Sequence, residues 1–278
     1  MTPDHARAAR DLLAFYLEAG VDWVVGETPV DRFAEADLIK PSAPAQAPES
    51  ADRSAADRRA PAVLRQAPAA PAADLAPPSP DAAVMAAREA ARRAASLEEL
   101  RSILEGFSGC ALKTTAKQLV FAAGNPRARV MFVGEAPGRD EDIEGRPFVG
   151  RSGKLLDRMM AAIGLDRTSS YIANVVPWRP PGNRTPTPQE TQICLPFILR
   201  QIELADPDVL VCLGGPSTQT LLGVKDGIMR TRGRWFAFHT GTREVRALAT
   251  LHPAYLLRQP LHKRLAWRDF LAIKQALA

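Results

Sequence analysis

Short apolar runs alternate with longer amphipathic stretches along the chain from residue 81 onward. The runs are five to seven residues long, as in buried strands, and the stretches between them place apolar residues at helical spacing. Strands separated by helices form parallel sheets covered on both faces, so the pattern predicts an α/β fold. The predicted strands are 128–133, 171–176, 209–213 and 245–251, and the predicted helices are 81–104, 152–163, 187–204, 216–222 and 261–277.

One predicted helix carries its own start signal. Thr187 can cap the helix, Pro188 suits the first turn because proline has no N–H, and Glu190 stands three residues after the cap. A glutamate at that distance can accept a hydrogen bond from the backbone N–H of the capping residue. This combination places the N-cap of the helix at Thr187.

The chain before residue 81 has a different composition. Residues 41–80 contain 9 Pro and 14 Ala in 40 positions, and no aromatic residue occurs between 34 and 106. Such a stretch buries too little apolar surface to offset its ordering entropy. The sequence therefore predicts a small helical N-terminal extension over 1–37, a flexible, disordered linker over 38–82 and a main domain over 83–278. The extension either binds a protein partner or has no activity of its own.

The net charge of +5 conceals an uneven distribution. Residues 1–94 hold 11 basic and 14 acidic side chains, whereas residues 95–278 hold 25 and 17, a net charge of +8. The last 54 residues hold 11 basic and 3 acidic side chains, which is a surplus of the same size. A basic C-terminal lobe favours a polyanionic partner such as nucleic acid. The alternative is an ordinary solvated basic surface.

Cysteine content and hydropathy bear on the compartment. The chain has 3 Cys, too few and too scattered for a disulfide framework, and its first ten residues show no apolar leader. It contains no run of 18 uncharged apolar residues, so no transmembrane span is expected. These features predict a cytoplasmic protein.

Unusual residues follow the predicted strands. Ligands of open parallel α/β sheets bind beyond the carboxyl ends of the strands, so residues at those positions are candidates for chemistry. Backbone amides of a Gly-rich turn can approach a ligand closely, and a carboxylate in a closed pocket can orient or deprotonate a water. The segments that follow the four strands are 134–150, 174–184, 214–215 and 252–258.

Individual side chains in these segments suggest more specific tasks. Phe148 offers a flat stacking surface, Asn174 offers an amide donor and acceptor, and His252 can donate a hydrogen bond to a developing anion. Leu256 and Leu257 can form an apolar wedge beside a cation. Each residue also has an ordinary structural interpretation, as a core side chain, a hydrogen-bonded strand end or a solvated turn. Their common location at strand ends favours a site.

Four ordered segments together resemble family 4 of the uracil-DNA glycosylase superfamily. The resemblance covers about residues 107–278 and implies a three-layer sandwich around a four-stranded parallel sheet. It also implies a catalytic domain over 83–278 that hydrolyses the N-glycosidic bond of deoxyuridine in DNA by base flipping, leaving an abasic site. The matching runs are GEAPGRDEDIEGRPFVGRSGKLLDRM (134–159), YIANVVPWRPPGNRTPTPQE (171–190), CLPFILRQIELADPDVLVCLGG (194–215) and HPAYLLR (252–258).

The resemblance implies a role for each matched residue. Phe148 stacks on the flipped uracil, Asn174 reads its N3 and O4 edge, and His252 donates to O2 of the departing base. Glu135 and Ala136 lie in the run whose backbone lines the pocket. An Asp that orients water in the best-known glycosylases is replaced by Ala136, so the water-orienting role falls to Glu141. Asp142 and Asp140 are the alternatives for that role, and Arg184, Leu256, Leu257 and Arg258 are the residues expected to contact DNA.

The cysteine positions depart from the family pattern. Members of family 4 usually bind a [4Fe–4S] cluster through four Cys. In this chain Phe107 and Trp178 stand at two of those positions, while Cys110 and Cys194 remain at the others. Two thiolates cannot hold a cubane that needs four ligands, so we expect no cluster and no other metal. Cys212 lies inside a predicted strand and is expected in the core.

Two other functions remain open from the sequence. The first alternative is a protein that binds damaged or abasic DNA on the same scaffold, with little turnover and with weak or altered base specificity. A nucleotide-binding α/β protein is disfavoured because the chain lacks G-x-x-x-x-G-K-[ST]. We expect a monomer whose partner is uracil-containing DNA, with basic residues Lys263, Arg264 and Arg268 near the phosphates. The preferred strandedness, other deaminated bases and the residue that excludes thymine are not determined by the sequence.

Overall fold

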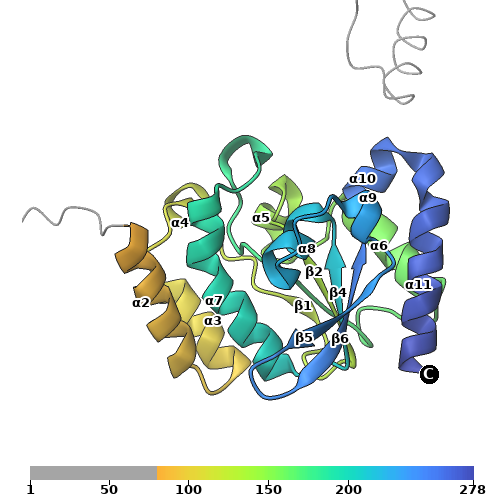
Figure 1. The fold of residues 1–278 in the computed structure, drawn as a ribbon. Helices are drawn as coiled ribbons and strands as arrows, with labels where there is room; N and C mark the ends of the chain where they lie inside the picture. The colour runs from red at the N-terminus through yellow and green to blue at the C-terminus, as the bar shows by residue number, and fades with distance from the viewer. Residues whose placement is uncertain (1–79) are drawn as a thin grey trace, which may run out of the picture. The chain divides into compact units, whose positions relative to one another are not determined.

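The computed structural model describes residues 80–278, and these build a mixed six-stranded sheet between two layers of helices (Figure 1). The predictions for the extension over 1–37 and for most of the linker lie outside the described residues. The strands are β1 (Ala123–Gly124), β2 (Val130–Gly134), β3 (Tyr171–Asn174), β4 (Val209–Leu213), β5 (Trp235–His239) and β6 (Glu244–Thr250). The helices are α2 (Pro80–Arg93), α3 (Leu97–Gly106), α4 (Leu112–Thr115), α5 (Arg139–Glu144), α6 (Arg151–Ala161), α7 (Pro188–Ala205), α8 (Gly215–Leu222), α9 (Ile228–Thr231), α10 (Pro253–Arg258) and α11 (Lys263–Leu277). Two 3₁₀ turns, η2 (Pro181–Asn183) and η3 (Pro260–His262), complete the described elements.

The predicted α/β sandwich is confirmed, but its sheet has six strands rather than four. The strand order is β1-β3-β2-β4-β6-β5, and the four inner strands run parallel as expected. The two additional strands pair antiparallel at the edges, β1 with β3 and β5 with β6. β1 is two residues long, and three of the five residues of β5 are exposed, so neither edge strand is buried on both faces.

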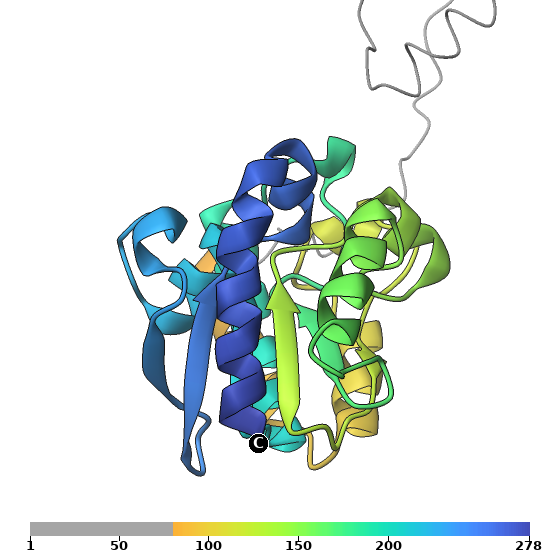
Figure 2. The ribbon, with the colours of Figure 1, turned by 90° about the vertical axis from the view of Figure 1, so that its right-hand side faces the viewer.

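Alternate residues of each inner strand point into two separate cores. Met131 and Val133 of β2 join the core under α2, α3 and α7, whereas Val130 and Phe132 join the core under α6 and α11. The Phe132 ring stacks on Phe270 of α11, with centroids 6.0 Å apart. Figure 2 shows α11 and α6 across the face of the sheet that is turned toward the viewer. Because the side chains alternate between the two faces, the sheet forms a middle layer with helices packed on each side.

The helix predictions are largely confirmed, with one break. The stretch 81–104 forms two helices, because Ser96 accepts a hydrogen bond from the backbone N–H of Glu99 and caps α3. The start of α7 is as predicted: the Thr187 side chain accepts from the N–H of Glu190, and the Glu190 carboxylate accepts from the N–H of Thr187. In the described part of the chain no helix is long and apolar enough to cross a membrane.

Two short helices that the pattern did not predict stand at the carboxyl ends of the strands. α5 follows β2, and α10 follows β6. Each has six residues, too few for the repeat of apolar positions that identifies a helix in a sequence. Because all four inner strands end at this edge, the loops and short helices after them enclose one region.

Candidate functional site

A cavity of about 630 Å³ lies at the carboxyl ends of the inner strands. Its walls come from the loop after β2, the end of β3, the loop after β4 and the turn into α10. The structure thus brings together the side chains that sequence reasoning placed after separate strands. The predicted residues that line this cavity are Glu135, Ala136, Glu141, Phe148, Asn174, Arg184, His252 and Arg258.

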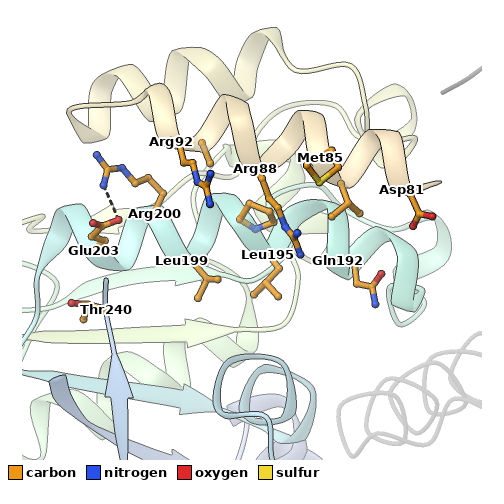
Figure 3. Close-up of a pocket in the computed structure, with 13 residues that line it drawn as sticks. Asp81, Met85, Arg88, Arg92, Gln192, Leu195, Leu199, Arg200, Glu203 and Thr240 are labelled. Carbon is orange, nitrogen blue, oxygen red and sulfur yellow. Dashed lines mark ion pairs between the residues drawn. The ribbon is translucent and has the colours of Figure 1, made fainter. Parts of the chain in front are cut away.

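A second cavity, of about 690 Å³, lies between α2 and α7 (Figure 3). It is lined by one face of each helix, with Met85 and Leu199 among its apolar side chains and an ion pair between Arg200 and Glu203 at 2.7 Å. No residue that the sequence singled out lines it. The strand-end cavity is therefore the candidate site, although it is slightly smaller.

Phe148 lines the strand-end cavity, and contacts from Arg167 fix its backbone. Its φ of 55° is left-handed, an uncommon conformation for an aromatic residue, and its side chain is buried. The Arg167 guanidinium donates to the carbonyl oxygens of Pro147 and Phe148 and pairs with Asp157 at 2.9 Å. Strained backbone of this kind persists where surrounding contacts over-determine it, often at functional sites. The sequence contains no signal for the part played by Arg167.

Gly134 leaves space for the groups above it. A Cβ at this position would lie 2.5 Å from Asn174 Oδ1 and 2.7 Å from Phe148 Cζ. Real Cβ atoms do not approach other atoms that closely, so the glycine is required by the packing of these two side chains. The missing side chain at the end of β2 thus allows the Phe148 ring and the Asn174 amide to pack beside the strand.

Asn174 carries an unsatisfied polar atom into the cavity. The side chain is buried at the end of β3, and its Oδ1 has no hydrogen-bond partner among the described residues. A buried acceptor without a partner costs about 1–3 kcal/mol, so its presence indicates a ligand that supplies a donor. The amide offers both an acceptor and a donor to such a ligand.

Glu135 carries a second unsatisfied atom. Its Oε1 is buried and has no partner within the described residues. Burial raises the pKa of this carboxyl above its ordinary value, because the charged form loses hydration. Two residues that line this cavity therefore each carry a buried oxygen without a hydrogen-bond partner, which is rare in a packed protein interior.

His252 is poised as a neutral hydrogen-bond donor. It caps α10, and its Nδ1 accepts a hydrogen bond from the backbone N–H of Ala254 at 3.1 Å. A nitrogen that accepts cannot carry the proton of a neutral ring, so the proton resides on Nε2. Loss of hydration, together with the positive charge of Arg258, lowers the pKa of His252 to about 4. The ring lies 5.5 Å from that of Phe148, centroid to centroid.

Of the three candidate carboxylates, Glu141 is the one that lines the cavity. One of its oxygens accepts from the N–H groups of Val149 and Gly150 at 3.0 and 3.1 Å, and the other accepts from Gly138 at 3.0 Å. These bonds hold the carboxylate between two loops of the site.

The other two carboxylates are placed differently. Asp142 does not line the cavity: it accepts from the N–H of Lys117 at 2.8 Å and lies 3.8 Å from the Arg179 guanidinium. Asp140 lines an adjoining, more open hollow beside Arg258. Asp142 is thus placed as an anchor between loops, and Glu141 has the better position for a water.

The residues expected to contact DNA differ in their exposure. Leu256 is fully buried, in a cluster with Leu251 and Ala266, whereas Leu257 is 36% exposed. Arg258 is exposed, and no hydrogen bond or ion pair engages its guanidinium within residues 80–278. Arg184 is engaged: it donates to both carboxylate oxygens of Glu190, at 2.7 and 2.8 Å. Leu257 and Arg258 are therefore the pair that is free to meet a ligand.

The positions implied for cluster ligands form part of an apolar core. Trp178 is fully buried, and the Phe107 ring packs edge-on against Phe197 with centroids 5.0 Å apart. The Cys194 thiol donates to Cys110 Sγ at 4.0 Å, and this bond together with burial raises the pKa of Cys194. Within the described part of the chain no group of three His, Cys, Asp or Glu side chains could hold a metal. These residues do not fit a four-thiolate cluster. Cys212 is in the core, as predicted.

Comparison with known proteins identifies the family of the chain. The model of the uracil DNA glycosylase superfamily matches residues 121–271, which is more than half of the chain. The chain belongs to this superfamily. It is 41% identical over 169 residues to a type-4 uracil-DNA glycosylase of Archaeoglobus fulgidus, covering 59% of this chain and 85% of the relative. It is 43% identical over 166 residues to the type-4 uracil-DNA glycosylase of Thermotoga maritima, covering 58% and 85%.

Proposed function

We propose that this protein is a uracil-DNA glycosylase, which hydrolyses the N-glycosidic bond of deoxyuridine in DNA. The observation that carries the proposal is the orphaned oxygen of Asn174, in a cavity that is also lined by the fixed ring of Phe148. The N3–H of a flipped uracil supplies the donor that this oxygen lacks. The relatives named type-4 uracil-DNA glycosylases support the same activity.

The base is recognised outside the helical stack. A nucleotide inside duplex DNA must be flipped out before its glycosidic bond can be reached. The flipped uracil stacks on Phe148, while Asn174 Oδ1 accepts from N3–H and the Asn174 amide group donates to O4. Cytosine presents an amino donor in place of O4 and has no proton on N3. A mispaired polar edge of this kind costs several kcal/mol, and rejection is of order 10³-fold or more.

Bond cleavage places negative charge on the leaving base. The bond between C1′ and the base nitrogen breaks, the base retains the electron pair, and the sugar acquires oxocarbenium character. The Nε2–H of His252 donates to O2, where this charge develops. Because His252 is neutral and already oriented by Ala254, the donor needs no reorganisation at the moment of reaction.

Water completes the reaction at the sugar. The Glu141 carboxylate, fixed by three backbone N–H groups, orients a water toward C1′. A bond forms between the water oxygen and C1′, and the released proton passes to the carboxylate or to solvent. The product is an abasic site. In the DNA itself, Leu257 enters the space of the flipped nucleotide, and Arg258 holds a phosphate.

An abasic-site assay tests the proposal. The protein is incubated with oligonucleotides that carry a single uracil, in single and double strands, and strand breaks are counted after alkali treatment. We expect breaks at the uracil that are lost in Asn174→Ala and in His252→Ala. Tight binding of the DNA without breaks would instead identify a protein that binds damaged or abasic DNA on this scaffold.

We further propose that the protein works without an iron–sulfur cluster. Phe107 and Trp178 fill the apolar core at two of the implied ligand positions, which supports this view. The test is chemical analysis of iron and acid-labile sulfide in protein purified without oxygen. We expect well under one iron per chain and no visible absorbance. Four irons per chain would overturn this part of the proposal, whatever the glycosylase activity.

The remaining predictions concern the setting of the protein. A monomeric state, a cytoplasmic location and a protein partner for the N-terminal extension stay predictions from the sequence.

A further inference from the structure

Large apolar side chains are exposed along the surface formed by η3 and α11. Leu261 is 84% exposed, Trp267 44% and Leu271 40%. Exposed apolar side chains that gather on adjoining elements can mark an interaction site, so these three residues are candidates for contact with a partner. We call these three residues, together with Lys263, Arg264 and Arg268, the α11 surface.

The charges of the α11 surface are uncompensated. Lys263, Arg264 and Arg268 are exposed, and none of them makes a hydrogen bond or ion pair within residues 80–278. The one acidic residue of α11, Asp269, is buried. It accepts from Arg232 and, at 2.7 Å, from the Thr250 hydroxyl. Three cations therefore surround Trp267 with no acid among them, which favours a polyanion.

An apolar hollow of about 210 Å³ adjoins Trp267. It is smaller than the roughly 300–1,000 Å³ typical of pockets for whole small molecules, so it suits a single group. Arg158 and Lys263 are the charged residues that line it. The remaining lining residues are Leu155, Met159, Ala162, Leu256, Ala266, Trp267 and Phe270.

The α11 surface continues directly from the candidate site. Leu256 of α10 lines the hollow, while its neighbours Leu257 and Arg258 line an open hollow at the strand ends. Tyr255 joins α10 to η3, because its hydroxyl lies 2.7 Å from His262 Nδ1 and the two rings stack. The helix α10, which carries Leu257 and Arg258, is therefore held against the start of α11 (Figures 1 and 2).

We propose that the α11 surface binds single-stranded DNA that continues from the strand holding the flipped nucleotide. An unstacked base packs against Trp267 at the hollow, and phosphates lie against Lys263, Arg264 and Arg268. Proteins bind single strands through this combination of aromatic faces and backbone cations. A protein partner would need acidic groups to meet the same three cations. The inference rests on the proposed function for the direction of the strand, and it assigns a binding surface to the DNA beyond the flipped nucleotide.

Binding by the full chain to a fluorescent single strand without uracil tests the proposal. Because this DNA cannot be cleaved, the test remains readable even if glycosylase activity is absent. We expect Trp267→Ala to weaken binding roughly tenfold or more, as for the loss of one stacked base. Trp267→Phe keeps an aromatic face and should recover most of the affinity. Arg268→Gln should reduce the slope of log Kd against log salt by about 0.7.

Trp235 provides a matched control. It is 37% exposed and lies on β5, the strand at one edge of the sheet, under the Arg246 guanidinium at 5.5 Å. Trp235→Ala should leave the affinity within twofold. The proposal is overturned if Trp267→Ala binds single strands as the natural protein does, or if Trp235→Ala loses as much. It is also overturned if Trp267→Ala changes only the oligomeric state, since the surface would then be a protein interface.

Discussion

The backbone N–H of Ala254 donates to Nδ1 of His252 at 3.1 Å, and this single bond determines which nitrogen of the ring carries the proton. The proton is left on Nε2 of a ring that lines the cavity. His252 thus serves at once as the cap of α10 and as a neutral donor to the leaving base. The turn that begins α10 therefore also orients the hydrogen-bond donor of the proposed reaction.

The pH dependence of activity follows from this arrangement. Since the pKa of His252 is lowered to about 4, the ring stays neutral at pH 5 to 8. We expect no loss of kcat attributable to His252 between pH 8 and 5, and a loss as the pH falls through about 4. A plot of kcat against pH that declines near 6.5 would show that the histidine titrates as an ordinary one.

Stability should respond to the same group. Above pH 6.5 the ring is neutral in both the folded and the unfolded chain, so it adds no pH dependence. Between 6.5 and about 4 the unfolded chain binds the proton more strongly, and the free energy of unfolding falls as the pH is lowered. His252→Asn keeps a capping side chain but lacks this dependence. Denaturant titrations of both proteins at several pH values measure the difference.

Removing Asn174 should separate activity from stability. Its Oδ1 is buried without a partner, so Asn174→Ala removes an unsatisfied atom and should not lower Tm. The variant should lose about 10²–10³-fold in kcat/KM for uracil release. Gln201→Ala is the matched control, because the Gln201 amide donates to the Tyr171 hydroxyl at 3.0 Å. It should lower Tm and leave kcat unchanged. An Asn174→Ala protein that unfolds early but stays active would contradict the assignment.

Gly134→Ala should block the pocket. The added Cβ meets Asn174 Oδ1 and Phe148 Cζ, so the amide and the ring must move away from their positions. We expect uracil release to fall about 10²-fold or more, a typical cost of a misplacement near 1 Å. Gly106→Ala, at the end of α3, meets no atom within 4 Å and should behave like the natural protein. Equal activity of the two variants would show that the pocket tolerates the change.

Phe107 and Trp178, the aromatic residues at the implied cluster positions, should stabilise the segments that contain them. Trp178 is fully buried, and Trp178→Ala should cost about 3–5 kcal/mol of unfolding free energy. The double variant Cys110→Ala, Cys194→Ala should cost much less and should keep its activity, since no cluster depends on the two thiols. Chemical denaturation gives both values. A severe loss in the cysteine variant, accompanied by loss of iron, would reverse this view.

Strong apolar runs were predictable, and weak edges were not. The four inner strands could be located because most of their residues are apolar and buried, and Thr187 to Glu190 marked the start of α7 through capping chemistry. The edge strand β5 was not predicted, although Trp235 to Phe238 are all apolar, and three of its five residues are exposed at the edge of the sheet. The sequence also offered no way to choose between Leu256 and Leu257. That choice depends on how a six-residue helix, α10, rotates its side chains against Ala266.

The candidate site was predictable in membership but not in geometry. Residues at strand ends converge because parallel strands finish at one edge, and this places Phe148, Asn174 and His252 together. Neither the left-handed backbone of Phe148 nor the contact of Arg167 with its carbonyl follows from local sequence. These features arise from packing between segments that are distant along the chain. Local sequence also does not distinguish Glu141 from its neighbour Asp142. Glu141 lines the cavity, and Asp142 does not.

The most direct test of uracil-DNA glycosylase activity is to identify the free base released from DNA. The full chain is incubated with single-stranded oligonucleotides that differ only in one base, uracil, cytosine or thymine, and the released base is identified by mass spectrometry. We expect free uracil from the first DNA, no free cytosine or thymine from the other two, and loss of uracil release in Asn174→Ala. Retention of every base on its strand, with the uracil DNA bound tightly, would contradict the proposed activity.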